Sequence, residues 1–243
     1  MTRFFVEPAE LMLDAPSLTG ENAKHAKVLR LKPGEEVLLC DGGGMEMLCA
    51  VTAVSDSRID LSVVERRASE TEARVRVSVY MAFPKADKLE HVIQKATELG
   101  AYEIVAFPCG RCISKPDDKS LAKKLERWQK IAASAAEQSG RGRIPQVLTL
   151  PSYKAALERA AQADQALLFY ENERATTLRM ALEAAPYETV SLLTGPEGGL
   201  EEKEVQQAMD AGFRVCTLGK RILRCETAPL CALSAVMYDA GEF

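Results

Sequence analysis

The sequence is poor in histidine and has no long apolar run. Its 243 residues include only two histidines, His25 and His91, so a His-rich zinc site or a Ser-His-Asp triad is not expected. No apolar run approaches the roughly 20 residues of a membrane-spanning helix, and the first residues lack the basic-then-apolar pattern of a signal peptide. We therefore expect a cytoplasmic protein with no membrane partner.

Three common site motifs are also missing. There is no G-x-G-x-x-G after the first strand of an α/β pattern, no G-x-x-x-x-G-K-[ST] and no G-x-S-x-G. These absences disfavour a dinucleotide-binding fold, a P-loop enzyme and a hydrolase with a nucleophile elbow.

Seven cysteines are an odd number scattered through apolar segments, which indicates reduced thiols rather than a disulfide framework. One pair, Cys109 and Cys112, follows a predicted strand, as in a thioredoxin motif. In such a motif the active helix begins at once, whereas residues 113–116 intervene here. A redox or metal-binding α/β protein is therefore one alternative, and two ordinary thiols beside a loop are the simpler interpretation.

The net charge of -4 gives no reason to expect a nucleic-acid partner, but this average hides a division by segment. Residues 1–72 contain 8 basic and 13 acidic residues, whereas residues 109–143 contain 9 basic and 4 acidic residues. The basic residues of this second segment are Arg111, Lys115, Lys119, Lys123, Lys124, Arg127, Lys130, Arg141 and Arg143. Such a stretch can follow an RNA backbone, although an amphipathic helix with a basic polar face is the simpler interpretation.

The expected elements change in type near residue 72. Before this point, short segments rich in β-formers are separated by turn residues such as Pro33-Gly34, which predicts a small β-barrel with one helix over 21–31. The predicted strands are 3–6, 36–40, 45–54 and 58–64. After it, strands alternate with helices, which predicts a mainly parallel α/β sheet covered on both faces. We therefore expect domains at 1–72 and 73–243.

The second domain shows this alternation along its whole length. Its predicted strands are 76–83, 103–108, 146–150, 165–170, 189–194 and 213–218. Its predicted helices are 87–99, 119–138, 152–162, 176–184, 200–211 and 226–239. Pro229 then falls in the first turn of the last helix, where a missing N–H costs little.

Two glycine-containing loops follow buried apolar strands near the end of the chain. The segment SLLTGPEGGL begins at Ser191, and LGKRILRCETAPLCAL begins at Leu218. In open α/β sheets, ligands bind at the carboxyl ends of adjacent strands. Each loop alone is compatible with a simple tight turn, but two such loops at neighbouring strand ends favour a ligand held largely by main-chain groups. Together with the missing motifs, this pattern indicates a nucleoside-like ligand.

These two loops resemble the paired signature of the SPOUT methyltransferases, whose C-terminal chain threads a trefoil knot. Three further segments resemble the 16S ribosomal RNA uridine-N3 methyltransferase family: HAKVLRLKPGEEV from His25, QKATELGA from Gln94 and EQSGRGRIP from Glu137. The matches span nearly the whole chain. The resemblance implies a PUA-like β-barrel that binds RNA at 1–72, a knotted α/β SPOUT domain at 73–243 and a homodimer formed through the knotted domain.

The resemblance also implies a function, which is methylation of uridine N3 in 16S ribosomal RNA with S-adenosyl-L-methionine as cofactor. The partner is then ribosomal RNA or the small ribosomal subunit, and no metal is required. Carried over by matching motif, the cofactor site consists of Leu168, Phe169, Tyr170, Thr194, Gly195, Pro196, Gly198, Leu218, Gly219, Ile222, Leu223, Arg224, Glu226 and Thr227. A non-catalytic RNA-binding assembly factor with the same knotted fold is the alternative.

Uracil N3 carries a proton that must leave during methylation, so the reaction needs a base or a cation that stabilises the uracilate. Arg224 and Glu226 are the catalytic candidates, and a structural ion pair or a helix N-terminal charge is the alternative for Glu226. The candidate RNA contacts are Arg3, Lys24, His25, Lys27, Arg30, Arg141 and Arg143. For those on the predicted helix, an ordinary solvated basic face is the alternative.

Overall fold

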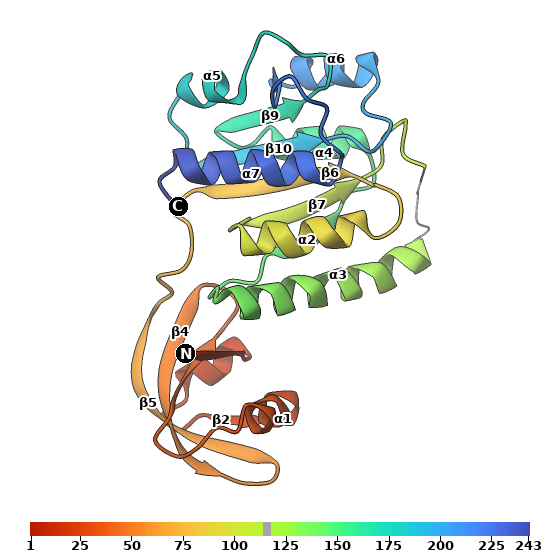
Figure 1. Ribbon diagram of the computed structural model, residues 1–243. Coiled ribbons are helices and arrows are strands. Elements are labelled where there is room, and N and C mark those ends of the chain that lie inside the picture. Colours follow the sequence, from red (N-terminus) through yellow and green to blue (C-terminus); the bar gives the residue numbers. More distant parts are fainter. Residues whose placement is uncertain (114–117) are drawn as a thin grey trace. The chain divides into compact units, whose positions relative to one another are not determined.

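The computed structural model describes residues 1–113 and 118–243 (Figure 1). The chain forms two compact units. The N-terminal unit consists of Met1–Glu72 and Ala136–Ile144, and the C-terminal unit consists of Ala73–Ala135 and Pro145–Phe243. The sequence-based division assigned residues 136–144 to the second domain, whereas their contacts group them with the N-terminal unit.

A curled five-stranded sheet forms the N-terminal unit. Its strands are β1 (Thr2–Phe5), β2 (Ser17–Thr19), β3 (Glu36–Cys40), β4 (Met45–Val54) and β5 (Arg58–Ala68), in the order β1-β3-β4-β5-β2. β1 pairs with β3 in parallel, and the other pairs are antiparallel. The 3-10 helix η1 (Pro8–Met12) and helix α1 (Gly20–Val28) complete this unit.

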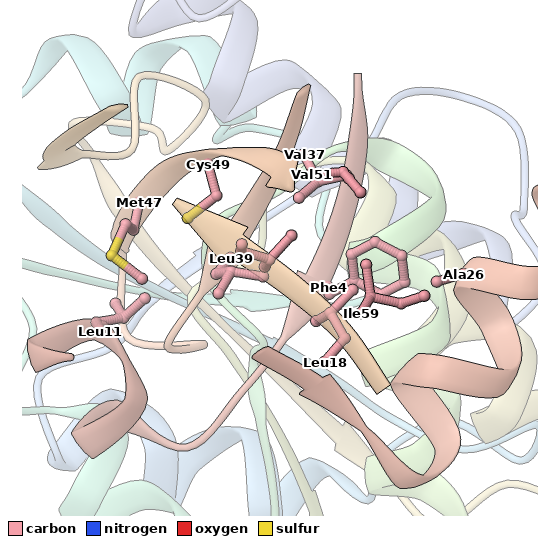
Figure 2. Packing of buried hydrophobic residues seen from close by; sticks show 11 residues of the cluster. Phe4, Leu11, Leu18, Ala26, Val37, Leu39, Met47, Cys49, Val51 and Ile59 are labelled. Carbon is pink, nitrogen blue, oxygen red and sulfur yellow. The ribbon is translucent and has the colours of Figure 1, made fainter. Parts of the chain in front are cut away.

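The concave side of this sheet holds the core of the N-terminal unit (Figure 2). Met47, Cys49 and Val51 alternate along β4 and are buried, as expected for a strand with one face toward the core. They pack with Phe4 and Ile59, which are fully buried. The period-two pattern of β4 therefore sets which face of the sheet closes over the core.

Six parallel strands form the sheet of the C-terminal unit. They are β6 (Arg76–Ala82), β7 (Glu103–Phe107), β8 (Gln146–Thr149), β9 (Gln165–Phe169), β10 (Thr189–Thr194) and β11 (Arg214–Cys216), in the order β11-β9-β10-β6-β7-β8. All of its pairings are parallel. Every residue of β7 is buried, which is typical of a strand covered on both faces.

Helices cover both faces of this sheet. They are α2 (Lys88–Glu98), α3 (Asp118–Ser139), α4 (Tyr153–Ala160), α5 (Leu178–Glu183), α6 (Glu202–Asp210) and α7 (Thr227–Asp239). α7 packs on β6 and β10 beside α2, and α4 lies behind the sheet against β6 (Figure 1). Pro229 is the third residue of α7, within its first turn, as predicted. Among residues 1–113 and 118–243, no helix is long and apolar enough to cross a membrane.

The sheet order determines where the site forms. Four adjacent strands of the sheet follow one another in the order β11-β9-β10-β6. Thr194 at the end of β10 pairs with Phe169 of β9 and Met81 of β6. Because these strands are parallel, the loops that follow them meet at one edge of the sheet. The two glycine-containing loops and the β6–α2 connection are therefore neighbours.

Candidate functional site

A cavity of about 420 Å³ lies at the carboxyl ends of β9, β10 and β11. Its volume is in the range of small-molecule pockets, which is roughly 300–1,000 Å³. Three segments provide most of its lining: residues 169–171 after β9, residues 194–200 after β10 and residues 217–225 after β11. We call residues 194–200 the first glycine loop and residues 217–225 the second glycine loop.

Most residues that the resemblance assigned to a cofactor line this cavity. They are Phe169, Tyr170, Thr194, Gly195, Pro196, Gly198, Leu218, Gly219, Ile222, Leu223 and Arg224. Leu168, Glu226 and Thr227 do not line it. Leu168 is fully buried within β9, and Thr227 is exposed as the first residue of α7. Glu226 instead joins an ion-pair network beside the cavity.

The first glycine loop folds back on itself at two glycines. Gly199 has a φ of +69°, and its N–H donates to the carbonyl of Pro196 at 2.9 Å. A Cβ on Gly195 would lie 3.1 Å from both the carbonyl carbon of Gly199 and Cγ of Leu200. These positions require glycine for the turn itself, and the same turn presents main-chain groups to the cavity.

The cavity has an apolar wall and a basic rim. Leu218, Ile222 and Leu223 line it, and Ile222 is 72% exposed. Arg221 and Arg224 are exposed on the same loop. An apolar surface beside open main-chain groups suits a nucleoside, and a basic rim suits a polyanion.

Sequence reasoning missed Lys88, the first residue of α2. Its Nζ lies 2.9 Å from Oε1 of Glu197 and 3.3 Å from Oε2 of Glu226. The hydrogen bond to Glu197 is the main reason that the pKa of Lys88 is raised to about 12. Its position could have indicated a role at the site, because Lys88 follows β6, whose carboxyl end lies at the same edge of the sheet as both glycine loops.

The two catalytic candidates occupy different environments. The pKa of Glu226 is lowered, mainly by a hydrogen bond from its own backbone N–H and, further, by Cys225 and Lys88. A carboxylate that is paired and has a lowered pKa is a weak proton acceptor, which favours the ion-pair interpretation for Glu226. Arg224 is exposed at the cavity, and within the described residues its side chain has no ion-pair partner. The geometry favours Arg224 as the group that contacts a substrate.

Two of the candidate RNA contacts are buried in ion pairs of the N-terminal unit. Arg3 lies 2.7 Å from Glu46, and the two side chains are 12% and 1% exposed. Arg141 lies 2.6 Å from Glu72, and its side chain is 6% exposed. Because these guanidinium groups already pair with carboxylates that are partly or fully buried, the geometry favours a structural role for both, and their contact with RNA stays a prediction.

The other candidates lie at the surface of the same unit or near it. Lys24, Lys27 and Arg30 are exposed, and the pairs of Lys24 with Glu21 and Lys27 with Asp56 are solvent-exposed pairs that contribute little. Nδ1 of His25 lies 3.0 Å from Glu137. Arg143 is partly buried, and its Nη2 donates to the carbonyl of Gly43.

Helix α3 carries the basic stretch that the sequence showed. Lys119, Lys123, Lys124 and Lys130 are exposed, and none forms an ion pair within the part of the chain that the structure describes. Arg127 is also exposed and pairs with Glu90 of α2 at 2.6 Å. Lys115 lies outside the described residues.

The Cys109 and Cys112 thiols are buried, with their sulfur atoms 3.4 Å apart. A hydrogen bond with Cys112 and burial both raise the pKa of Cys109. Reactive cysteines need the thiolate form, so this environment disfavours the redox interpretation. Arg111 lies between them in the sequence, and its Nη1 donates to the carbonyl of Gly198 at 2.8 Å, so this turn supports the first glycine loop.

Comparisons with known proteins identify the family. Models described as an RNA methyltransferase domain and an RNA methyltransferase PUA domain match residues 71–237 and 18–64. The ribosomal RNA small subunit methyltransferase E of Bacillus subtilis (strain 168) is 38% identical over 98% of this chain and 97% of its own. The enzyme of that name from Mycobacterium tuberculosis (strain CDC 1551 / Oshkosh) is 36% identical over 89% of this chain and 84% of its own.

A solved structure extends the comparison to the fold. The crystal structure of a ribosomal RNA small subunit methyltransferase E from Neisseria gonorrhoeae bound to S-adenosyl methionine superposes with a TM-score of 0.85 and 32% identity. The match covers 98% of this chain and 97% of that chain. The predicted fold class, a PUA-like barrel followed by an α/β SPOUT domain, is confirmed. The chain belongs to the RNA methyltransferase family that includes the ribosomal RNA small subunit methyltransferases E.

Proposed function

We propose that this protein transfers a methyl group from S-adenosyl-L-methionine to N3 of a uridine in 16S ribosomal RNA. The observation that carries the proposal is the cavity formed by the two glycine loops, in a chain whose relatives are named as ribosomal RNA small subunit methyltransferases. We place the reaction in the cytoplasm and take ribosomal RNA or the small subunit as the substrate.

The residues of the cavity fit this cofactor. Leu218, Ile222 and Leu223 offer an apolar wall for an adenine ring, and the turn at Gly195 leaves main-chain groups open to its polar edge. Glu171 also lines the cavity and is exposed, so a carboxylate is present for a cationic ligand. When bound, the cofactor supplies a methyl group on a sulfonium, which an in-line nucleophile accepts.

The chain itself has two tasks in this reaction. It must hold the uracil ring, extruded from any stack, in line with the methyl group, since positioning supplies much of the acceleration. It must also stabilise the negative charge that develops as N3 loses its proton. We assign the second task to Arg224, because its guanidinium is exposed at the cavity without an ion-pair partner among the described residues. Glu226 is the second catalytic candidate, in the different role of a base that takes the N3 proton.

The basic groups around the cavity support an RNA substrate. Lys220 and Arg221 are exposed on the second glycine loop, which also carries Arg224. The exposed lysines of α3 give the C-terminal unit a second basic surface, and those of α1 give one to the N-terminal unit. Local groups of this kind bind phosphates even on a chain whose net charge is -4.

We also propose a homodimer formed through α7. Pro229, Leu233 and Val236 face the interior of the C-terminal unit, while Cys231 and Tyr238 on the other side are exposed. A helix that is apolar on both sides is usually covered on both sides. A second copy of this chain, packed through a two-fold axis, would cover the outer side.

Two measurements test the proposed function. Calorimetric titration should show binding of S-adenosyl-L-methionine, and ribosomal subunits from a strain that lacks the enzyme should gain one methyl group on a uridine. Mass mapping of the modified nucleotide then identifies the position. Methylation of another base, or of another atom of uracil, would contradict the N3 assignment. RNA binding without methyl transfer would favour the non-catalytic assembly factor.

A further inference from the structure

A third segment joins the two glycine loops at the cavity. It is the β6–α2 connection, residues 83–87, together with Lys88. The backbone N–H of Lys85 donates to Oε1 of Glu197 at 3.0 Å, and Nζ of Lys88 lies 2.9 Å from the same oxygen. Nζ of Lys88 also lies 3.3 Å from Glu226, which directly follows the second glycine loop. One ammonium group therefore contacts a carboxylate from each side of the cavity.

These contacts are partly shielded from water. The side chains of Lys88, Glu197 and Glu226 are 26%, 27% and 21% exposed. Burial acts to raise the pKa of Glu197, but the hydrogen bonds from Lys88 and the backbone outweigh it, so its pKa is lowered. With the pKa of Glu226 also lowered and that of Lys88 raised, all three groups are charged at neutral pH.

The backbone that presents Lys88 is strained. Ala86 has a φ of +56°, in the left-handed region that residues with a Cβ rarely adopt. Such a conformation persists only where its surroundings enforce it. Here the contacts on both sides of Ala86, from Lys85 and Lys88 to Glu197, provide that constraint. The turn is therefore held in one conformation by the cavity loop that it supports.

We propose that Lys88 is a positioning residue that fastens the two glycine loops to each other, so that the cavity is closed to its working shape before the cofactor binds. The cofactor's identity rests on the proposed function, whereas the fastening itself does not. Preorganising loops in this way raises affinity because the cost of ordering them is met during folding.

A direct catalytic role for Lys88 is disfavoured by its hydrogen bonds. An ammonium has three donors, and Nζ of Lys88 has three acceptors: Glu197, Glu226 and the sulfur of Cys225 at 3.8 Å. None of its donors is left for a substrate. Lys88 therefore acts through the loops and not on the reacting atoms.

The test compares Lys88→Met with a matched variant on the same helix. Among the described residues, Lys95 forms an ion pair with Glu98 alone, 2.8 Å away on α2, so Lys95→Met removes an ammonium without touching the loops. Hydrogen–deuterium exchange of the ligand-free protein should become faster in residues 194–200 and 217–226 for Lys88→Met only. Calorimetry should show a Kd for S-adenosyl-L-methionine raised roughly tenfold. The KM for the cofactor should rise with it, while kcat at saturating cofactor stays near its original value.

A conservative variant separates fastening from a general effect on folding. Lys88→Arg keeps a cation with several donors, so it should restore most of the lost affinity and slow the loop exchange again. Unchanged exchange and unchanged Kd in Lys88→Met would overturn the proposal, and so would a fall in kcat at an unchanged Kd. If the original protein does not bind the cofactor, the proposed function fails, and the exchange experiment still decides the role of Lys88.

Discussion

At the scale of single residues, Gly195 leaves little room for a side chain in the first glycine loop. Gly195→Val would place methyl groups against Gly199 and Leu200, where even a Cβ lies 3.1 Å from two atoms. We expect binding of S-adenosyl-L-methionine to fall below detection in calorimetry and methylation to be lost with it. Ala175→Val, on an exposed loop outside the cavity, is the control. Full methylation by Gly195→Val would show that the cofactor assignment is wrong.

A substitution of Arg141 tests whether this residue of the N-terminal unit stabilises the fold through its ion pair with Glu72. Glu72 accepts hydrogen bonds from this side chain and from the N–H groups of Gly142 and Arg143. Arg141→Met leaves the carboxylate short of its strongest partner, so we expect the free energy of unfolding in urea to fall by about 2–4 kcal/mol. Lys24→Met, which removes only an exposed pair, should change it by less than about 1 kcal/mol. If RNA affinity falls and stability does not, the structural role is contradicted.

The sequence was informative about residues whose role depends on their near neighbours. The turn at Gly195 and Gly199 involves residues within a few positions of each other, so the motif TGPEGG alone points to it. Lys88 and Arg3 could not be interpreted in the same way. Their partners Glu226 and Glu46 lie far along the chain, and only the sheet order brings them together. A basic residue therefore looks the same in sequence whether it faces a phosphate or a buried carboxylate.

At the scale of elements, the lysines of α3 should contribute to RNA binding through charge. Lys119, Lys123 and Lys130 follow one side of the helix at spacings of four and seven residues. For Lys123→Gln combined with Lys130→Gln, we expect the slope of log affinity against log salt for 16S ribosomal RNA to decrease by roughly 1.4–1.8. Lys154→Gln combined with Arg179→Gln, on α4 and α5, removes the same charge elsewhere. An equal decrease in both variants would indicate a general effect of net charge.

The ion pairs between the β6–α2 connection and the glycine loops predict a pH dependence. The pKa values of Glu197 and Glu226 are lowered from an ordinary 4.5, so their contribution to stability is present above pH 4.5 and is lost as the pH falls further. The pKa of Lys88 is raised from 10.5 to about 12, so its contribution is present below pH 10.5 and is lost as the pH rises through 12. The difference in Tm between the original protein and Lys88→Met should be constant between these limits and narrow outside them. A difference that changes between pH 6 and pH 8 would point to another titrating group.

Periodicity predicted well which segments are helices and which are strands. It predicted less well where these elements begin and end and which strands pair. β3, β4 and β10 begin and end where the pattern placed them. α4 and α5 begin later, because Ser152 and Thr177 accept a hydrogen bond at the helix N-terminus and are caps. β2 is three residues long and was missed. The parallel pairing of β1 with β3 was not predicted either, because η1, β2 and α1 lie between these two strands in the sequence.

At the scale of the whole molecule, the proposed homodimer gives a direct prediction. Tyr238 is 73% exposed on the outer side of α7. Tyr238→Glu would place a charge in the proposed interface, so sedimentation velocity should show a single chain of 26.6 kDa where the original protein has twice that mass. Met180→Glu, at another exposed apolar residue, should remain a dimer. A monomeric original protein, or a dimer that tolerates Tyr238→Glu, would contradict the proposed interface.

The N-terminal unit is discontinuous in sequence, because it combines residues 1–72 with residues 136–144. The residues between these two segments belong to the C-terminal unit. This segment provides the N–H groups of Gly142 and Arg143 for Glu72 and the N–H of Ile144 for the carbonyl of Gly42. During synthesis, the first 72 residues leave the ribosome long before these partners exist. The barrel therefore cannot complete its hydrogen bonds until residue 144 has emerged, when residues 73–135 of the C-terminal unit have already been made.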